Sequence, residues 1–263
     1  MALAAITVHF ENPEQTSRLI DSLQKFDAIE RIVVILHGEY PQPKDTSRVT
    51  FIRQENQGYA AGLNRAVNEL RKHGPEVDLV LAINPDVNFE YIRMNELVES
   101  HKQSQADCTF PAIQEGNRVI HGYEFTSLGT MRLVETGALT YSGACFLFNV
   151  AAWEKVSGFN EQYFHYYEDA DFCMRLQRAG CCIHHAASVV FQHVGKSGAD
   201  YPTTALPRYA VRNHLLFLSN LGRLSTLAFM NVSIRHLLYL FRWKHGWRGI
   251  GEWYRGIQEF RHL

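Results

Sequence analysis

The sequence predicts an α/β protein with a Rossmann-like, mostly parallel central sheet and a helical extension at its C-terminal end. Three observations lead to this prediction. Short apolar runs rich in β-branched residues alternate with segments whose apolar residues recur at helical spacing over residues 4–83. The last of these runs ends in polar and acidic residues, and from residue 204 the pattern is only helical. Alternating strands and helices are typical of a parallel sheet covered by helices.

The alternation is regular in the first half of the chain. Residues 31–36 (RIVVIL) are almost continuously apolar, which is typical of a parallel strand buried on both faces. Further strands are expected at residues 4–10, 49–53 and 78–83, and helices at residues 16–26 and 58–71. Because ligands bind at the carboxyl ends of strands in such sheets, Asn84-Pro85-Asp86 lies at the edge of the expected site.

The second half of the chain is less regular. Strands are expected at residues 141–150 and 188–193, and helices at residues 151–156, 168–179, 209–221 and 225–241. Gly180, directly after one of these helices, is a typical helix terminator.

The length bounds the number of domains. At roughly 150 residues per domain, 263 residues make one large domain or one domain with an appendage. We expect a domain over residues 1–205, with halves of about 1–105 and 106–205, and a helical extension over residues 206–263.

The composition fits a folded protein and argues against one that coats nucleic acid. The chain is 46% hydrophobic and 20% charged, and its formal net charge is 26 − 27 = −1. The charge is uneven: residues 207–263 hold 9 Lys and Arg against 2 Asp and Glu, a net of +7, which leaves −8 on residues 1–206. A basic, aromatic C-terminal segment suggests a surface for an anionic membrane or a polyanion. Ordinary helix packing or a homodimer contact is the alternative.

Cysteine use and the lack of long apolar stretches indicate the compartment. The five cysteines are odd in number and Cys181 and Cys182 are adjacent, so free thiols in a reducing compartment are expected. The first ten residues lack the basic segment of a secretory signal, and no stretch approaches about 18 uninterrupted apolar residues. We expect a cytoplasmic protein, with residues 206–263 as a peripheral contact to the inner face of the cytoplasmic membrane.

Two groups of acidic residues are the strongest candidates for chemistry. Asp86 ends an apolar strand, where it would suit Mg²⁺ together with substrate phosphates, although a turn or helix cap is the commoner role of such a residue. Glu168, Asp169 and Asp171 fall within four residues, directly after an aromatic run. Apolar surroundings raise the pKa of a carboxyl towards the range useful for a general base, and a solvated helix start is the alternative.

Other motifs are weaker on their own. Residues 56–64 run as a small-residue loop into a helix and suit an anion or tight packing, but Gly58 and Gly62 are four apart and form no dinucleotide fingerprint. The Gly-Lys-Ser at 195–197 is not part of a phosphate-binding loop, since Val190 stands where that motif needs glycine. The Cys and His residues between 173 and 185 match no ordinary zinc spacing.

Several of these pieces occur in a specific order. They are NQGYAAGLNRA (56–66), LAINPDV (81–87), SGACFLF (142–148) and GFNEQYFHYYEDADFCMRLQRAG (158–180), followed by His193 and Ser197. In this order and spacing the chain resembles family 2 glycosyltransferases with the GT-A fold, within the bacterial rhamnosyltransferase-like group. The resemblance covers roughly residues 4–220.

The resemblance implies a role for individual residues. It implies Asp169 as the catalytic base, with Glu168 and Asp171 shaping the acceptor pocket. It implies Asp86 and His193 as ligands of Mg²⁺ or Mn²⁺. The residues that it implies for nucleotide-sugar binding are His9, Phe10, Glu11, Glu39, Asn56, Gly58, Asn64, Asn84, Gly143 and Ala144.

One departure concerns the nucleotide base. The family usually carries an Asp after its second strand, but Leu36-His37-Gly38-Glu39 contains none, so Glu39 or His37 would replace it or base recognition is altered. The end of the first strand also differs from the family's pattern.

The implied reaction is transfer of a sugar from a nucleotide-diphosphate donor to a saccharide hydroxyl, with inversion, in bacterial surface polysaccharide (O-antigen or capsule) synthesis. The expected donor is dTDP-rhamnose, and a UDP-hexose (galactose, glucose or N-acetylglucosamine) is the alternative. The acceptor would be a saccharide or a lipid-linked saccharide, and no nucleic acid partner is expected. A non-catalytic nucleotide-sugar-binding protein is a rival from another class. A nucleotidyltransferase is disfavoured because residues 10–13 are not a glycine-rich basic loop.

Overall fold

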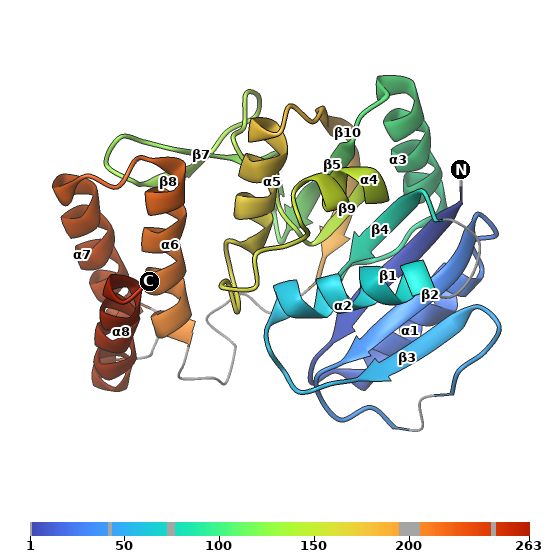
Figure 1. Cartoon of the computed structure of the whole chain (residues 1–263), viewed down its shortest axis with the longest axis horizontal. Coiled ribbons are helices and arrows are strands. Elements are labelled where there is room, and N and C mark those ends of the chain that lie inside the picture. Colours follow the sequence, from blue (N-terminus) through green and yellow to red (C-terminus); the bar gives the residue numbers. More distant parts are fainter. Residues whose placement is uncertain (1, 42–43, 73–76, 195–205, 243–245) are drawn as a thin grey trace.

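The central sheet carries helices on both faces, and three further helices follow at the C-terminal end (Figure 1). The computed structural model describes residues 2–41, 44–72, 77–194, 206–242 and 246–263. The sheet runs in the order β10-β5-β9-β4-β1-β2-β3, and β6 pairs with β5. Its strands are β1 (Leu3–His9), β2 (Ile29–Leu36), β3 (Val49–Arg53), β4 (Leu79–Ile83), β5 (Cys108–Glu115), β6 (Arg118–Ile120), β9 (Cys145–Asn149) and β10 (Ile183–His193).

Most strand pairs in the sheet are parallel, as the sequence predicted. Strand β1 pairs in parallel with both β2 and β4, β2 with β3, and β10 with β5. Strand β9 is antiparallel to both β4 and β5, so it joins the two parallel halves. The α/β fold class is confirmed.

The helices divide between the two faces because the strand side chains alternate. Leu3 and Ala5 of β1 pack with α1 (Pro13–Gln24) and α3 (Tyr91–Ser104). Ala4 and Ile6 face α2 (Tyr59–Lys72), α4 (Val150–Lys155) and α5 (Glu168–Arg178). Helix α1 begins earlier than the apolar spacing indicated, because the Asn12 side chain caps the backbone N–H of Gln15.

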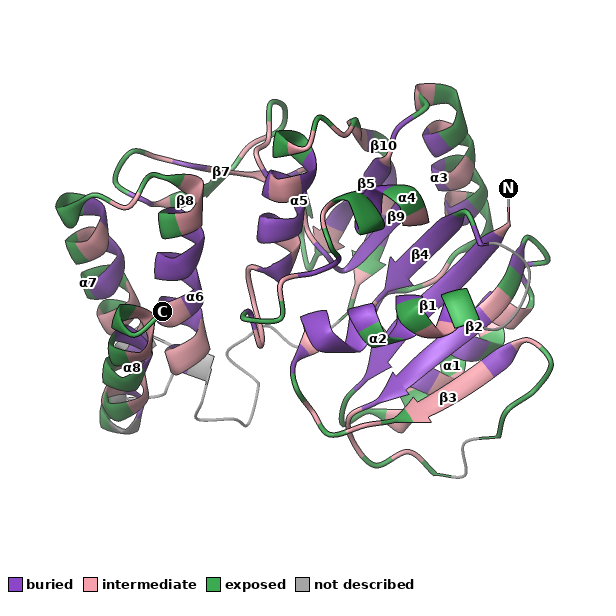
Figure 2. Cartoon of the chain, viewed as in Figure 1, coloured by how far each residue is buried: buried purple, intermediate pink, exposed green. Residues whose placement is uncertain are grey.

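A third core belongs to the C-terminal helices α6 (Leu206–Leu221), α7 (Thr226–Arg242) and α8 (Gly246–Arg261). Their buried residues pack against Met174 of α5 and against Phe125 in the hairpin of β7 (Tyr123–Phe125) and β8 (Met131–Leu133). Figure 2 shows the buried stripe of α6 and the more exposed outer faces of α7 and α8. Within the described residues, no helix has the length and apolar character needed to cross a bilayer.

The domain boundary expected near residue 205 and the expected Ser197 lie outside the described residues. The boundary therefore stays a prediction. The sequence interpretation named no element corresponding to α3, β5, the β7–β8 hairpin or α8, and it shortened β10 by its first five residues, 183–187.

Candidate active site

A chain of hydrogen bonds links the ends of two strands to the start of α5. The backbone N–H of Asn84, just after β4, donates to the carbonyl of Ala144 over 2.8 Å. The neighbouring Gly143 N–H, just before β9, donates to Asp169 Oδ2 over 2.7 Å. The segment that carries Asp86 is therefore joined to Asp169 through two adjacent residues, although the two acids are far apart in the sequence.

Tyr59, at the start of α2, lies among the same acids. Its hydroxyl donates to Asn84 Oδ1 over 2.6 Å. Burial raises the pKa of its phenol well above the usual value, and the charges of Glu168, Asp169 and Asp86 raise it further. Tyr59 is thus bonded to the Asn84–Asp86 segment, whose Asn84 backbone also bonds Ala144 beside the Gly143 that holds Asp169.

Asp169 is held by the backbone on two sides. Its Oδ2 accepts from Gly143 N–H, and its Oδ1 accepts from Ala170 N–H over 2.7 Å in the first turn of α5. Burial raises the pKa of the carboxyl, and these two N–H groups oppose the rise. A Cβ on residue 143 would lie 2.7 Å from the Cβ of Asp169, so glycine is needed there for this approach. The result is a rigidly oriented carboxylate with raised basicity.

Glu168, the adjacent acid, has a different environment. It is 8% exposed, and its Oε2 has no hydrogen-bond partner among the described residues. Burial raises its pKa to about 8, with a further contribution from the charge of Asp169. Burial and mutual repulsion disfavour ionisation of both carboxyls at once, and the two backbone N–H groups that bind Asp169 favour it as the ionised member of the pair.

Asp86 and His193 meet at the other end of the site. A β-bridge between Val87 and His193 carries the end of β10 beside the segment after β4. His193 Nε2 lies 3.0 Å from Asp86 Oδ1, close enough for an ion pair when the imidazole is protonated. A carboxylate and an imidazole side by side are also ligand types that a divalent cation accepts.

Glu115 of β5 contacts the other ring nitrogen of His193. Its Oε1 lies 3.3 Å from Nδ1, because the parallel register pairs His193 with Glu115. Burial alone would lower the pKa of His193, but the two carboxylates outweigh it and raise the pKa to about 9. Across the described residues there is no group of three or more His, Cys, Asp or Glu that could hold a metal ion.

The loop before α2 packs against the segment before α5. Asn56 Oδ1 accepts from the Gly58 N–H, and Tyr59 N–H donates to the carbonyl of Phe164 over 3.0 Å. Gly58 has a φ of +102°, and a Cβ there would lie 2.4 Å from the Phe164 oxygen. Asn56 and Gly58 therefore shape the wall beside Tyr59.

The residues expected to hold the nucleotide base lie at the ends of β1 and β2. Both ring nitrogens of His9 are used, Nδ1 with Thr16 Oγ1 at 2.7 Å and Nε2 with the Glu39 carbonyl at 3.0 Å. His9 is buried and fixes the loop after β2, whereas Phe10 is 40% exposed and Glu11 has a φ of 63°. Of this group, Phe10, Glu11 and Glu39 are exposed and only His9 is buried.

Two predicted contact residues do not face the site. The side-chain amide of Asn64 makes all its hydrogen bonds inside the protein. Its Nδ2 donates to the Phe159 carbonyl and to Glu161, and its Oδ1 accepts from Trp153 Nε1 and the Phe159 N–H. Asp171 is 1% exposed and pairs with Arg175 over 2.6 Å. The expectation that these two side chains touch ligands is corrected: both hold the fold, and the spacing of four between Asp171 and Arg175 on a helix was the available signal.

Three residues at the site were missed. Tyr59 and Glu115 contact Asn84 and His193, as described above. Burial raises the pKa of Tyr123 on β7, and the charges of Glu115 and Asp169 add to the rise. A tyrosine on a short hairpin gives no sequence signal of this kind.

Comparison with known proteins identifies the class. A family model described as glycosyl transferase family group 2 matches residues 102–244, more than half of the chain. The chain belongs to this family and is a glycosyltransferase.

Two characterised relatives are more distant. The chain is 23% identical over 292 residues to N-acetylglucosaminyl-diphospho-decaprenol L-rhamnosyltransferase of Mycobacterium tuberculosis, which covers 84% of this chain and 94% of that protein. It is 26% identical over 140 residues to a low-salt glycan biosynthesis hexosyltransferase of Haloferax volcanii. That match covers 47% of this chain and only 44% of the relative's length.

Solved structures share the GT-A fold. A mannosyltransferase from Pyrobaculum calidifontis in complex with GDP-mannose and Mn²⁺ matches with a TM-score of 0.59 and 11% identity, over 92% of this chain and 75% of that one. TarS 1-349 of S. aureus in complex with UDP-GlcNAc matches with a TM-score of 0.63 and 13% identity, over 99% and 80%. At such identities the likeness shows the fold alone.

Proposed function

We propose that this glycosyltransferase moves a sugar from a nucleotide-diphosphate donor to a saccharide hydroxyl with inversion at the anomeric carbon. The observation that supports the proposal is the pair of backbone contacts between the segment of Asp86 and Asp169, in which Asn84 N–H donates to the Ala144 carbonyl and Gly143 N–H donates to Asp169 Oδ2. One end of the site offers a carboxylate and an imidazole, and the other offers a single ionised carboxylate. Asp169 accepts two backbone N–H bonds whereas Glu168 Oε2 has no partner among the described residues, which favours one ionised carboxylate at this end and supports a single displacement.

Asp169 acts as the general base. Its carboxylate accepts the proton of the acceptor hydroxyl as the oxygen attacks the donor's anomeric carbon. The N–H groups of Gly143 and Ala170 keep the carboxylate in one orientation, which a positioned base requires. Burial raises the pKa of Glu168, one residue earlier, which favours a carboxyl that can donate a hydrogen bond to the acceptor.

Asp86 and His193 hold Mg²⁺ or Mn²⁺ in this proposal. When bound, the cation stabilises the negative charge that gathers on the leaving nucleoside diphosphate. The side chains of both residues are about one-fifth exposed, at 18% and 20%, so they are accessible from solvent. Glu115 orients the His193 ring from behind, as carboxylates do for metal-binding histidines.

The proposed donor is dTDP-rhamnose. The mycobacterial relative, which matches most of this chain, is an L-rhamnosyltransferase, and this supports the choice. A UDP-hexose is the second candidate, favoured by the hexosyltransferase relative and by the fold shared with a UDP-GlcNAc complex. A thermal-shift screen of nucleotide sugars with and without Mn²⁺ separates the two donors.

The proposed acceptor is a saccharide of a bacterial surface polysaccharide, carried on a lipid at the inner face of the cytoplasmic membrane. An exposed apolar stripe on α7 supports membrane contact of residues 206–263, with Leu227 67%, Ile234 52% and Leu238 63% exposed. Replacing these three residues by serine should reduce flotation with anionic liposomes without unfolding the protein. Equal flotation of the variant, or loss of a homodimer instead, would reject the membrane contact.

The proposed function is tested by turnover and by donor binding in parallel. The wild-type protein should consume its donor only with Mg²⁺ or Mn²⁺ present, and Asp86→Ala should weaken cation-dependent nucleotide binding. Arg255→Gln, an exposed change on α8, is the control. Nucleotide-sugar binding without any donor consumption would favour a non-catalytic binding protein instead.

A further inference from the structure

Asn84 begins the turn that carries Asp86, and its backbone groups are already used. Its N–H donates to the Ala144 carbonyl over 2.8 Å, and its own carbonyl accepts from Val87 N–H over 3.1 Å. Pro85 occupies the second position of this four-residue turn, where its fixed φ is favoured. The backbone of Asn84 is therefore fixed, and only its side-chain amide can still change orientation.

Tyr59 fixes the orientation of that amide. Its hydroxyl donates to Asn84 Oδ1 over 2.6 Å, so the amide oxygen is directed at the phenol. The nitrogen Nδ2, on the other branch of the planar amide, is not buried and makes no hydrogen bond to any described residue. Burial raises the pKa of the Tyr59 phenol well above its usual value, so the O–H donor is present throughout the neutral range. The amide therefore keeps its N–H groups free for a ligand.

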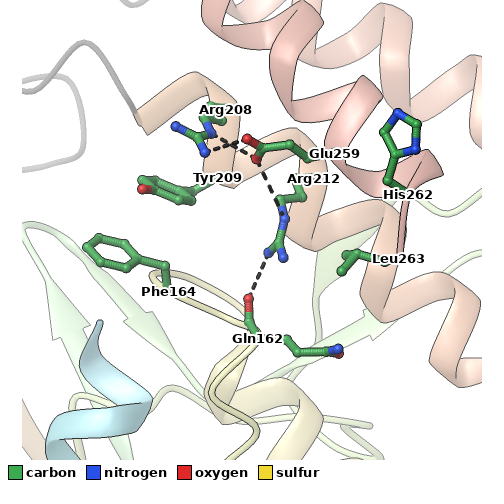
Figure 3. Close-up of a pocket in the computed structure, with 8 residues that line it drawn as sticks. All are labelled: Gln162, Phe164, Arg208, Tyr209, Arg212, Glu259, His262 and Leu263. Atoms are coloured by element: carbon green, nitrogen blue, oxygen red, sulfur yellow. Dashed lines mark hydrogen bonds and ion pairs between the residues drawn. The ribbon is translucent and has the colours of Figure 1, made fainter. Parts of the chain in front are cut away.

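The Tyr59 ring is itself held on two sides. It packs against the core on the α2 face of the sheet, and the backbone N–H of Tyr59 donates to the Phe164 carbonyl over 3.0 Å. Phe164 is braced in turn by its ring, which stacks on Tyr209 of α6 with centroids 4.6 Å apart (Figure 3). Because the ring is already ordered, its hydroxyl can hold another side chain at little further entropic cost.

A side-chain amide can meet a ligand in two ways. Its oxygen accepts hydrogen bonds or binds a cation, whereas its NH₂ group only donates hydrogen bonds. The bond to Tyr59 uses the oxygen of Asn84 and leaves the two donors. The diphosphate and the ribose of a nucleotide both carry oxygens that accept such bonds. Asn84, two residues before Asp86, is thus prepared to donate to a nucleotide oxygen.

We propose that Tyr59 is a positioning residue of the transferase, whose hydroxyl turns the Asn84 amide so that its NH₂ group donates to an oxygen of the nucleotide's diphosphate or ribose. This inference rests on the proposed function, because it names the residue that orients one of the nucleotide contacts. Tyr59 acts through Asn84 and does not itself touch the nucleotide. Without the hydroxyl, the amide can rotate and turn its own oxygen towards the oxygens of the ligand, which is unfavourable.

The test is a double-mutant cycle on the dissociation constant of dTDP, measured by calorimetry on the full chain with Mn²⁺ present. UDP replaces dTDP if it binds the wild type more tightly. Tyr59→Phe keeps the ring and should weaken binding about fivefold, the usual effect of losing one neutral hydrogen bond. Asn84→Ala should weaken binding by a similar factor. The double variant should match Asn84→Ala to within about twofold, because the hydroxyl acts only through that amide.

Tyr254→Phe is the matched control. It removes a phenol that is 55% exposed on α8, and it should bind the nucleotide as the wild type does. In turnover assays, Tyr59→Phe should raise the KM for the donor more than it lowers kcat, whereas a merely structural role would lower Tm and leave the KM unchanged. Should Tyr59→Phe fold poorly, Asn84→Asp keeps an acceptor for the hydroxyl but has no N–H, and it should weaken dTDP binding without added cation.

Thymidine as a second probe locates the oxygen. A loss confined to dTDP assigns the contact to the diphosphate, an equal loss with thymidine assigns it to the ribose, and either result supports the proposal. Wild-type affinity of Tyr59→Phe or of Asn84→Asp would overturn it. So would a loss of roughly 25-fold in the double variant, the product of two independent fivefold effects. The proposed function fails separately, by absence of wild-type donor turnover.

Discussion

The substitution Gly143→Ala tests how closely the catalytic base is held. The φ of Gly143 is not in the left-handed region, so alanine is allowed by the backbone and the only obstacle is contact. The added Cβ would lie 2.7 Å from the Cβ of Asp169 and 3.1 Å from its Oδ2. Carbon atoms normally approach to about 3.5–4.0 Å, so the Asp169 side chain has to move by about 1 Å.

A displacement of about 1 Å at a reacting group costs roughly 10²-fold in rate. We therefore expect kcat of Gly143→Ala to fall about 100-fold at saturating donor and acceptor. Cation-dependent nucleotide binding should change little, because Asp86 and His193 are untouched. Gly251→Ala, with open space around its added Cβ, is the matched glycine control. A kcat within twofold of the wild type, in a folded Gly143→Ala protein, would refute the reasoning.

Three further predictions follow from the surroundings of the site. Glu115→Gln should weaken Mn²⁺ affinity about tenfold through the loosened His193 ring, measured by calorimetry with nucleotide present; unchanged affinity would show that Glu115 does not position the ring. The pKa of Glu168 is raised from 4.5 to about 8 on folding, so stability falls as the pH rises through that window. Glu168→Gln cannot ionise, so its Tm minus that of the wild type should increase as the pH rises from about 5 to about 9. A Tm difference that does not change with pH would contradict this. Asn64→Ala should lower the free energy of unfolding, measured by urea denaturation, by about 1–3 kcal/mol for each buried donor left unpaired, the Trp153 indole among them. The nucleotide affinity of the folded variant should be unchanged.

The sheet and its first helices could be predicted because their signal is local. Strands β2 and β4 are buried on both faces, so their apolar runs are nearly continuous. Helix α2 shows its small and apolar face at regular spacing. The convergence of Asp86 and Asp169 could be anticipated only through the order of motifs along the chain, since no local pattern links them.

The missed elements lack such a signal. Pro111 interrupts the pattern of β5, and the structure accommodates it where the partner strand β10 shifts register between Ala186 and Val190. Glu115 acquires its contact with His193 only from the parallel register of these two strands. Asp171 was assigned to the acceptor pocket through the resemblance, whereas its burial beside Arg175 depends on how α5 packs.

The central claim is that Asp169 takes the acceptor's proton at a site whose donor half is built by other residues. The most direct measurement compares kcat and cation-dependent nucleotide affinity of Asp169→Asn with those of the wild type. The account predicts a kcat lower by roughly 10²–10⁴-fold, the usual contribution of a general base, with nucleotide affinity preserved. Near-normal turnover by Asp169→Asn would contradict it.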